Sequence, residues 1–395
     1  MTKVWPFGCL AAVLVCGCSP SPVPQPPVVE EVVPEPVMLR VATYNTALSR
    51  DTAGELLAAL RTGTDPAAMG IAQVIQSVRP DVLLLQEVDA DADGATLTVF
   101  HDQYLAVAQG GQEPITYAHR WVAPSNTGQP SGVDLDGDGS VGGAGDALGY
   151  GEFPGQYGFA ILSRFPLATS SVRTFQTLKW SQVPGAALPM QADGAPFYSE
   201  AALAVLPVSS KNHVDLAVTL DEGRALHVLA SHPTPPVFDG PEDRNGLRNH
   251  AEISLWSRYL DPASTLPDDK GVAGGLAEDS HFVIMGDLNA DPLDGDSVVG
   301  AMDQVLRHPR VSASAAVGAL APRSDGGAEN AQSPGDRGDP AYDTAAWGLR
   351  VDYVLPSATL DVTGSGVHWP LQASPAHAAA AFSDHRMVWV DLSVK

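Results

Sequence analysis

Residues 282–292 read FVIMGDLNADP, a run of four apolar residues that leads into Gly286 and Asp287, with Asn289 two positions later. A short apolar run bounded by turn-forming residues is typical of a buried strand. Because side chains alternate along an extended chain, Asp287 and Asn289 are expected to project from the same face at the strand's end. An Asp–Asn pair is also typical of a simple turn. The segment alone leaves both interpretations open.

The same reasoning applied along the chain predicts a mixed α/β (α+β) protein. A helix is expected to begin at Pro66, with Asp65 as its N-cap, and to stop at Pro80, and another helix is expected over 245–260. Strands are expected over 38–47, 81–89, 157–167, 201–208, 214–220, 225–233, 281–290, 350–357 and 385–392. Helices alternate with some of these strands, whereas others adjoin with no room for a crossover. We therefore expect two packed mixed sheets flanked by helices.

Two segments do not fit this pattern. Residues 109–156 and 321–344 are rich in Gly, Asp and Pro, and we expect long surface insertions there.

Composition limits the partners of the chain. Its 395 residues are 44% hydrophobic, enough for a full core, and its formal net charge is −24. Such an acidic chain repels polyanions, so tight nucleic-acid binding is not expected. A phosphate could still be bound where metal ions screen the charge locally.

The N-terminus is expected to direct export. Residues 1–17 resemble a signal peptide, and Gly17-Cys18 resembles the site at which bacterial lipoproteins are cleaved and lipidated. Residues 18–38 form a proline-rich linker, with the folded domain expected over 39–395. We expect a cell-envelope lipoprotein attached to the membrane only by its lipid anchor, or a secreted protein if Cys18 is not lipidated. The three cysteines lie at positions 9, 16 and 18, so none is left for a disulfide in the domain.

Polar residues recur where the predicted strands end. They are Asn45, Glu87, His232, Asp287, Asn289, Asp352, Asp384 and His385. Each has a structural explanation when taken alone, such as a turn, a cap or a hydrogen-bonded core histidine. Together they are typical of a metal-assisted hydrolytic site held by a rigid sheet.

Seven segments, six of which contain these residues, occur in an order that resembles the endonuclease/exonuclease/phosphatase superfamily. They are VATYNTA, LLLQEVD, YGFAILSRFP, LASHPTPP, IMGDLNADP, RVDYVLPS and FSDH, and they span about residues 39–394. The resemblance implies a DNase I-like four-layer sandwich and hydrolysis of a phosphoester by in-line attack of water. It also implies a divalent cation, Mg²⁺ with Mn²⁺ as the alternative, because oxygen ligands suit these ions.

The resemblance also implies roles for the acidic and amide residues. Glu87 is the principal metal ligand, with Asn45 beside it, and Asp384 matches a further metal-site residue. Asp287 binds metal or orients the attacking water. Asn289 holds a phosphate oxygen.

The resemblance also implies roles for the two histidines and for two further residues. His385 resembles the general base or transition-state stabiliser, and Asp352 matches the carboxylate that orients it. His232 resembles a second histidine that contacts phosphate or acts as general acid. Tyr157 and Arg164 follow the family pattern, Tyr157 as a weak substrate-binding candidate and Arg164 in a structural role.

An acidic stretch within the first insertion departs from the family pattern. Asp134, Asp136 and Asp138 reproduce the opening of an EF-hand-type Ca²⁺ loop, whereas Gly145 occupies the position of the terminal glutamate. Either Ca²⁺ binding in the 134–146 loop or a solvated acidic loop is compatible with this pattern.

Two arginines are weak candidates for substrate binding. Arg244 and Arg248 could clamp a substrate phosphate. They could also pair with Asp243 and Glu252 on a helix surface, and we prefer that interpretation.

The sequence therefore predicts an exported, metal-dependent phosphoesterase that is expected to be monomeric. Its substrate could be a nucleic acid, a phospholipid or a small phosphoester. The competing hypothesis is a non-catalytic surface protein that uses its acidic loops to bind calcium or a partner.

Overall fold

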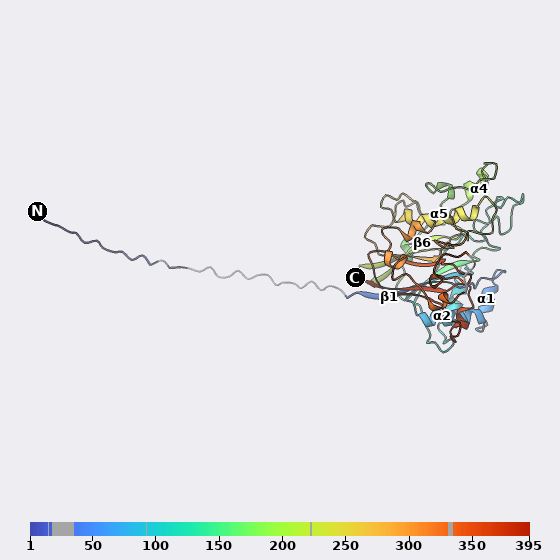
Figure 1. The fold of residues 1–395 in the computed structure, drawn as a ribbon, viewed down its shortest axis with the longest axis horizontal. Coiled ribbons are helices and arrows are strands. Elements are labelled where there is room, and N and C mark those ends of the chain that lie inside the picture. Colours follow the sequence, from blue (N-terminus) through green and yellow to red (C-terminus); the bar gives the residue numbers. More distant parts are fainter. Residues whose placement is uncertain (15, 18–34, 92, 222, 331–334) are drawn as a thin grey trace. The chain divides into compact units, whose positions relative to one another are not determined.

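The computed structural model describes residues 1–14, 16–17, 35–91, 93–221, 223–330 and 335–395 (Figure 1). The chain divides into two units, Met1–Glu35 and Pro36–Lys395. The described residues of the first unit form neither helix nor strand. Cys18 and most of the predicted linker lie outside the described residues. No helix in the described part of the chain is both long and apolar enough to cross a membrane.

The second unit contains all the regular structure that is described. Its helices are α1 (Glu55–Leu60), α2 (Pro66–Val78), α3 (Ala95–Phe100), α4 (Glu200–Val205), α5 (Arg244–Tyr259), α6 (Asp303–Leu306), α7 (Ala313–Ala316), α8 (Asp325–Ala328) and α9 (His377–Ala380). Its strands are β1 (Val37–Asn45), β2 (Val82–Val88), β3 (His119–Val122), β4 (Gly158–Ser163), β5 (Arg173–Thr174), β6 (His213–Asp221), β7 (Arg224–Ser231), β8 (Phe282–Asp287), β9 (Asp352–Pro356), β10 (Asp361–His368) and β11 (Met387–Val394).

The strands form two mixed sheets. One has the order β10-β11-β1-β2-β4-β3 and the other β5-β6-β7-β8-β9. Each contains one parallel pair, β1–β2 in the first sheet and β7–β8 in the second, and the other neighbours are antiparallel. Parallel neighbours need a crossover, which α2 supplies between β1 and β2 and α5 between β7 and β8.

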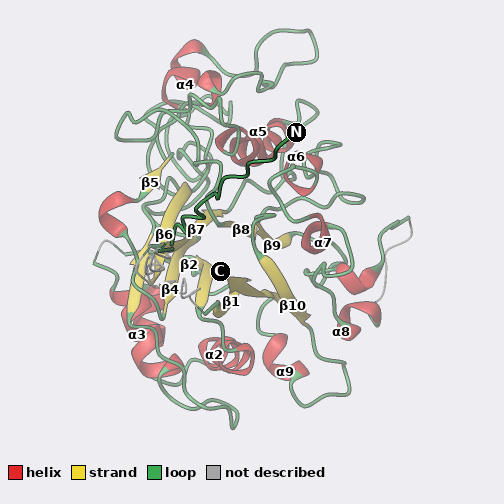
Figure 2. Cartoon of the chain, turned by 90° about the vertical axis from the view of Figure 1, so that its left-hand side faces the viewer, coloured by secondary structure: helices red, strands yellow, loops and turns green. Residues whose placement is uncertain are grey.

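The two sheets pack face to face with helices on their outer sides. Side chains from β1, β2 and β4 and from β6, β7 and β8 share one apolar core. A second core lies between α2 and the first sheet, and a third between α5 and the second sheet. Figure 2 shows α5 and α6 on one side of the strands and α2 and α9 on the other. This α/β/β/α arrangement confirms the predicted fold class.

Strand β2 shows why its sequence is apolar throughout. Leu83 and Leu85 pack toward α2, whereas Val82 and Leu84 face the core between the sheets. Both faces of the strand are buried, so alternation of apolar and polar residues is absent.

One predicted strand is wrong. Residues 201–208 contribute instead to α4, whose N-cap Ser199 accepts a hydrogen bond from the Ala202 backbone N–H. A short apolar run can be a buried strand or one face of a helix, and here the serine cap and the alanines favour the helix. In addition, β10 was not predicted, and β3 forms a sheet edge inside the segment expected to be an insertion.

The two sheets are joined at the buried side chain of Gln86 on β2. Its Oε1 accepts hydrogen bonds from Thr43 Oγ1 (2.8 Å) and from the Asp287 backbone N–H (2.9 Å). Its Nε2 donates to the Ser231 carbonyl at 3.4 Å. This single amide therefore sets the position of β8 and of the end of β7 relative to the first sheet.

Gly286 lies at this crossing and leaves no room for a side chain. Its φ is 149°, and an added Cβ would lie 2.0 Å from the Ser231 carbonyl oxygen. We expect Gly286→Ala to lower the free energy of unfolding by about 3 kcal/mol or more, from backbone strain and overpacking together. Urea denaturation measures this loss.

Gly300→Ala is the matched control. Gly300 also has a positive φ, 83°, but an added Cβ would have no neighbour within 4 Å. Only backbone strain of about 1–2 kcal/mol is expected there. Equal losses in the two variants would contradict the close approach at Gly286.

Candidate active site

The predicted site residues meet where the two parallel strand pairs end. Asn45 is the last residue of β1, Glu87 lies near the end of β2, and Asp287 is the last residue of β8. His232 directly follows β7. Because both pairs present their carboxyl ends at the same edge, four distant segments bring their polar side chains together.

Asn45 is the centre of this group. Its buried Nδ2 donates to Glu87 Oε1 and to Asp287 Oδ2, each at 3.0 Å, and lies 3.4 Å from His385 Nε2. The Asn45 carbonyl accepts a hydrogen bond from Ser383 Oγ at 2.8 Å. Glu87 and His385, separated by almost 300 residues, therefore contact the same amide.

His385 is oriented by two carboxylates and a tryptophan. Its Nδ1 lies 2.8 Å from Asp352 Oδ2, and its Nε2 lies 3.6 Å from Asp287 Oδ2. The Trp347 ring packs edge-on, with ring centroids 5.0 Å apart. Asp352 is the first residue of β9, and Thr344 Oγ1 accepts a hydrogen bond from its backbone N–H at 2.9 Å. The imidazole has one well-defined orientation.

The charges of this group determine its protonation. Burial alone would lower the pKa of His385, but the Asp352 and Asp287 carboxylates outweigh burial and raise this pKa to about 10. Burial alone would raise the pKa of Asp287, but His385 and His232 hold it well below its usual range. In the metal-free protein at neutral pH, Asp287 is therefore an anion beside an imidazolium.

His232 differs from His385 in its protonation. Its Nε2 lies 3.4 Å from Asp287 Oδ2 and 3.9 Å from Glu87 Oε1. Burial and the charge of Lys211 lower the pKa of His232. A neutral His232 can donate its Nε2–H to Asp287 while the other ring nitrogen stays free of the carboxylates.

The donor set fits a hard divalent cation. One ligand atom each from Glu87, His232 and Asp287 lies within 4.8 Å of the others, and so do those of Asp287, Asp352 and His385. The Asp287 side chain is 1% exposed, whereas that of Glu87 is 26% exposed and borders a cavity. Carboxylates with one open side suit an ion that retains several waters. Glu87 and Asp287, with Asn45 between them, would hold such an ion.

Asn289 is placed differently from the prediction. Strand β8 ends at Asp287, and Asn289 has a left-handed conformation with φ 51°. Its backbone N–H donates to Asp287 Oδ1 at 2.8 Å, and its Nδ2 donates to the Pro233 carbonyl at 3.1 Å. The expectation that both side chains project from one strand face is therefore wrong. The segment is a turn and also part of the site.

Two of the other predicted residues, Asp384 and Tyr157, lie at the border of the site, whereas Arg164 lies just beyond the far end of β4, away from Glu87. Asp384 is next to His385 in sequence, but its side chain is exposed and does not belong to the clusters of possible metal ligands among the described residues. Tyr157 lines the same cavity as Glu87. Arg164 pairs with Asp81 at 2.9 Å, which is a structural contact.

The two arginines on α5 have other partners than those predicted. Arg244 forms an ion pair with Glu242, and its guanidinium lies 5.5 Å from the Phe197 ring centroid. Arg248 is buried and donates to the carbonyls of Val208, Leu148 and Pro207. The predicted pairing with Asp243 and Glu252 on a helix surface is wrong, because this part of α5 faces the protein interior.

A cavity of about 640 Å³ opens beside Glu87 and His232. Its wall includes four aromatic side chains, those of Tyr150, Tyr157, Tyr198 and Phe238. Lys211, Arg244 and Arg248 supply positive charge to the same cavity. A phosphoryl group at the carboxylates therefore has an enclosed space next to it for the rest of a substrate.

The predicted calcium loop forms another part of this wall. The carboxylates of Asp134, Asp136 and Asp138 lie within 4.8 Å of one another, and Asp136 and Gly145 line the cavity. Asp146 turns inward and accepts hydrogen bonds from backbone N–H groups of the loop. The three aspartates are thus gathered as the Ca²⁺ hypothesis requires.

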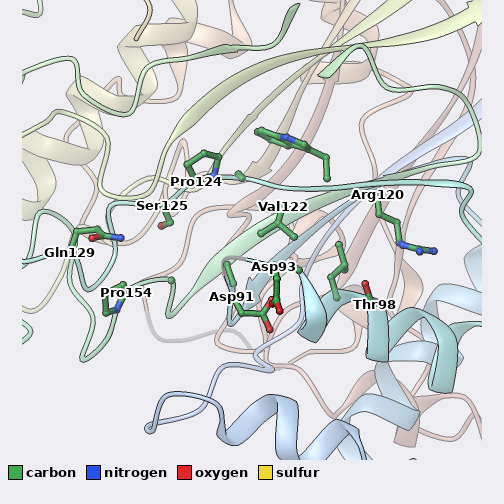
Figure 3. A pocket seen from close by; sticks show the side chains of 15 residues that line it. Asp91, Asp93, Thr98, Arg120, Val122, Pro124, Ser125, Gln129 and Pro154 are labelled. Atoms are coloured by element: carbon green, nitrogen blue, oxygen red, sulfur yellow. The ribbon is translucent and has the colours of Figure 1, made fainter. Parts of the chain in front are cut away.

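A second cavity, of about 650 Å³, lies elsewhere and contains none of the predicted site residues. Figure 3 shows Asp91, Thr98 and Arg120 among the side chains that line it. The Asp91 carboxylate accepts hydrogen bonds from the backbone N–H and the hydroxyl of Thr96, which is a helix-capping contact. This cavity is therefore separate from the group of residues around Asn45.

Sequence reasoning missed three residues of the site. Gln86 was detectable, because it is an uncharged polar residue within an apolar run. Lys211 lies two residues before β6 and belongs to no recognised motif. Trp347 lies just after the second predicted insertion (321–344), and nothing in its local sequence indicated contact with His385.

The Asp352–His385 contact should affect how the free energy of unfolding depends on pH. Asp352→Asn removes one of the two carboxylates that raise the pKa of His385, so this pKa should fall from about 10. A raised histidine pKa stabilises the folded protein fully below the unfolded-state value of about 6.5 and loses that effect as pH rises toward 10. EDTA-treated wild-type protein should therefore lose more unfolding free energy between pH 7 and 10 than Asp352→Asn. NMR titration of His385 and urea denaturation measure both quantities, and an unchanged His385 pKa would contradict the assignment.

Comparison with known proteins agrees with this geometry. The chain matches the model of the Endonuclease/Exonuclease/phosphatase family over residues 42–385. A search of curated proteins found no match. Among solved structures, an endonuclease/exonuclease/phosphatase from Beutenbergia cavernae DSM 12333 is 18% identical, with a TM-score of 0.47 over 90% of this chain and 72% of that one.

Two further structures have similar values. A family protein from Leptotrichia buccalis C-1013-b is 14% identical, with a TM-score of 0.45 over 90% of this chain and 99% of that one. Sphingomyelinase C from Streptomyces griseocarneus is 16% identical, with a TM-score of 0.42 over 91% of this chain and all (100%) of that one. Because the family model covers most of the chain and the predicted motifs, this protein belongs to the endonuclease/exonuclease/phosphatase family.

Proposed function

We propose that this protein is a Mg²⁺-dependent hydrolase of phosphoesters. The observation that carries the proposal is the single amide of Asn45, which contacts Glu87, Asp287 and His385 at once. Oxygen donors for a cation and an oriented imidazole are thereby held within one small volume. When bound, Mg²⁺ would neutralise phosphoryl charge and assist the attack of water.

Three residues of the chain can take part in the hydrolysis itself. Asp287 is anionic and buried, so it can accept a hydrogen bond from the attacking water and align it with the phosphorus. His385, protonated and fixed by Asp352, can donate through Nε2 to a phosphoryl oxygen as negative charge develops. Neutral His232 has a single N–H, and donating it to Asp287 holds that carboxylate in place; contact with the leaving oxygen would require this hydrogen bond to be exchanged.

The shape and charge of the site favour compact substrates. The net charge of −24 opposes a long polyanion, and the cavity beside Glu87 encloses the organic part of a small phosphoester. A nuclease that cuts transiently and a lipid phosphodiesterase are the alternatives within the same chemistry. Ca²⁺ in the 134–146 loop stays a prediction, and so does the monomeric state.

The first test of the proposal is metal dependence. Wild-type protein should hydrolyse bis-p-nitrophenyl phosphate or p-nitrophenyl phosphate with Mg²⁺ and lose that activity in EDTA, with restoration by Mg²⁺. His385→Ala should reduce kcat by about 10²–10⁴-fold while the circular dichroism spectrum stays unchanged. The preferred ester shows whether the enzyme is a diesterase or a monoesterase.

His281→Ala serves as the control for that substitution. His281 is partly exposed, and its Nδ1 lies 2.9 Å from Thr359 Oγ1, outside the group around Asn45. This variant should keep wild-type turnover. Absence of metal-dependent turnover on both esters and on DNA would support the competing hypothesis of a non-catalytic binding protein.

We also propose that the protein is exported and anchored through a lipid on Cys18. The support is the sequence alone: Gly17-Cys18 at the end of an apolar N-terminal run, followed by a proline-rich stretch. In a bacterial host, wild-type protein should fractionate with membranes and Cys18→Ser should not. Cys9→Ser is the matched control and should stay with the membranes. Equal partition of the wild-type protein and Cys18→Ser would refute the anchor.

A further inference from the structure

Lys211 is a buried cation in the wall of the active-site cavity. The chain has five lysines, at positions 3, 179, 211, 270 and 395, all within the described residues. Lys211 is the buried one, 7% exposed. It lies two residues before β6 and lines the cavity together with Glu87 and His232.

The ammonium group of Lys211 has no direct partner. Among the described residues, its Nζ forms neither a hydrogen bond nor an ion pair, although the carboxylates of Glu252, Glu87 and Asp287 attract it from a distance. Glu252 cannot approach more closely without losing other bonds. Its oxygens already accept from the backbone and hydroxyl of Ser210 and from the backbone of Thr234.

An unpaired ammonium that is largely removed from water is costly, although Lys211 Nζ is not among the fully enclosed polar atoms of the described residues. Removing a cation from water without a hydrogen-bonded partner costs several kcal/mol, and well-packed apolar replacements are often more stable. Burial accordingly lowers the pKa of Lys211, and the three carboxylates oppose that shift. A residue of this kind is typical of a site that is completed by a ligand, here one with negative charge.

The backbone around Lys211 is held firmly. The Lys211 carbonyl accepts from the Asn126 backbone N–H at 3.0 Å, and Asn212 Nδ2 donates to the Pro124 carbonyl at 2.9 Å. Glu252 joins the segment before Lys211 to the segment after His232 through Ser210 and Thr234. The cation and the histidine are thus positioned by one carboxylate, before any ligand arrives.

We propose that Lys211 binds a non-bridging oxygen of the substrate's phosphoryl group inside this cavity. The inference rests on the proposed function and adds a second positive charge to it, in the same cavity as the Mg²⁺ that the carboxylates would hold. A phosphoryl group between them would give Lys211 the hydrogen-bonded anion that the protein itself does not supply. Lys211 thereby restricts the site to ligands that bring an oxyanion into the cavity.

The test compares wild-type full-length protein with Lys211→Met by isothermal titration calorimetry. Inorganic phosphate, titrated into Mg²⁺-loaded protein, should bind Lys211→Met about 10–100-fold more weakly, as expected for the loss of one charged hydrogen bond. Mg²⁺ alone should bind as tightly as in the wild type or more tightly, because a nearby positive charge has been removed. The melting temperature should be unchanged or higher.

Lys270→Met is the matched control. Lys270 is exposed, and its Nζ donates to the Val172 carbonyl at 3.0 Å. This variant should keep wild-type affinities for phosphate and Mg²⁺. If Lys211→Met does not fold, Lys211→Gln, which keeps a neutral polar end, takes its place with the same expected loss.

The outcomes separate this inference from the proposed function. Loss of phosphate affinity in Lys211→Met supports the assignment of Lys211, whether or not the wild-type protein hydrolyses either ester. Failure of the wild-type protein to hydrolyse both esters would overturn the proposed function alone. Metal-dependent turnover in the wild type with unchanged phosphate affinity in Lys211→Met overturns the role of Lys211 alone. A lower melting temperature with unchanged phosphate affinity identifies Lys211 as a structural counter-ion for Glu252 and likewise overturns the inference.

Discussion

The structure depends on one buried carboxamide between two sheets. Gln86 has no access to water, so its polar atoms must find partners within the protein. It finds them on both sheets: Thr43 on β1, the Asp287 backbone on β8 and the Ser231 carbonyl at the end of β7. A slide of one sheet over the other would disrupt the close-packed core between them and would also break these bonds. Gln86 therefore sets the register in which the strand ends meet.

The candidate active site lies directly beside these hydrogen bonds. Glu87 follows Gln86, Asp287 is the residue whose backbone Gln86 holds, and His232 follows Ser231. Carboxylates from the two sheets converge on the Asn45 amide, and the resulting negative charge is balanced by His385 and, at a greater distance, by Lys211. The site is thus rich in charge that has few protein partners, which suits a cation and a phosphoryl group arriving together.

Prediction from local sequence was correct where a pattern is compatible with only one kind of structure. The helix from Pro66 to Val78 has a proline at its start and an aspartate cap, and both ends agree with the structure. Prediction failed where one pattern serves two structures. The apolar run at 201–208 could not distinguish a strand from α4. Arg248 resembled a surface residue because the sequence does not show which face of α5 is covered.

The sequence by itself determined the family, the two-sheet class and the polar residues at the strand ends, because apolar periodicity and motif order are local properties. Only the tertiary structure decided which of those residues meet. Asn289 adopts a left-handed conformation in a turn beside Asp287. Asp384 is an exposed neighbour of His385, and Lys211 is an unpaired cation in the wall of the cavity. The physical reason is that burial, charge balance and hydrogen-bond partners arise between segments 40 to 340 residues apart, which no local pattern can specify.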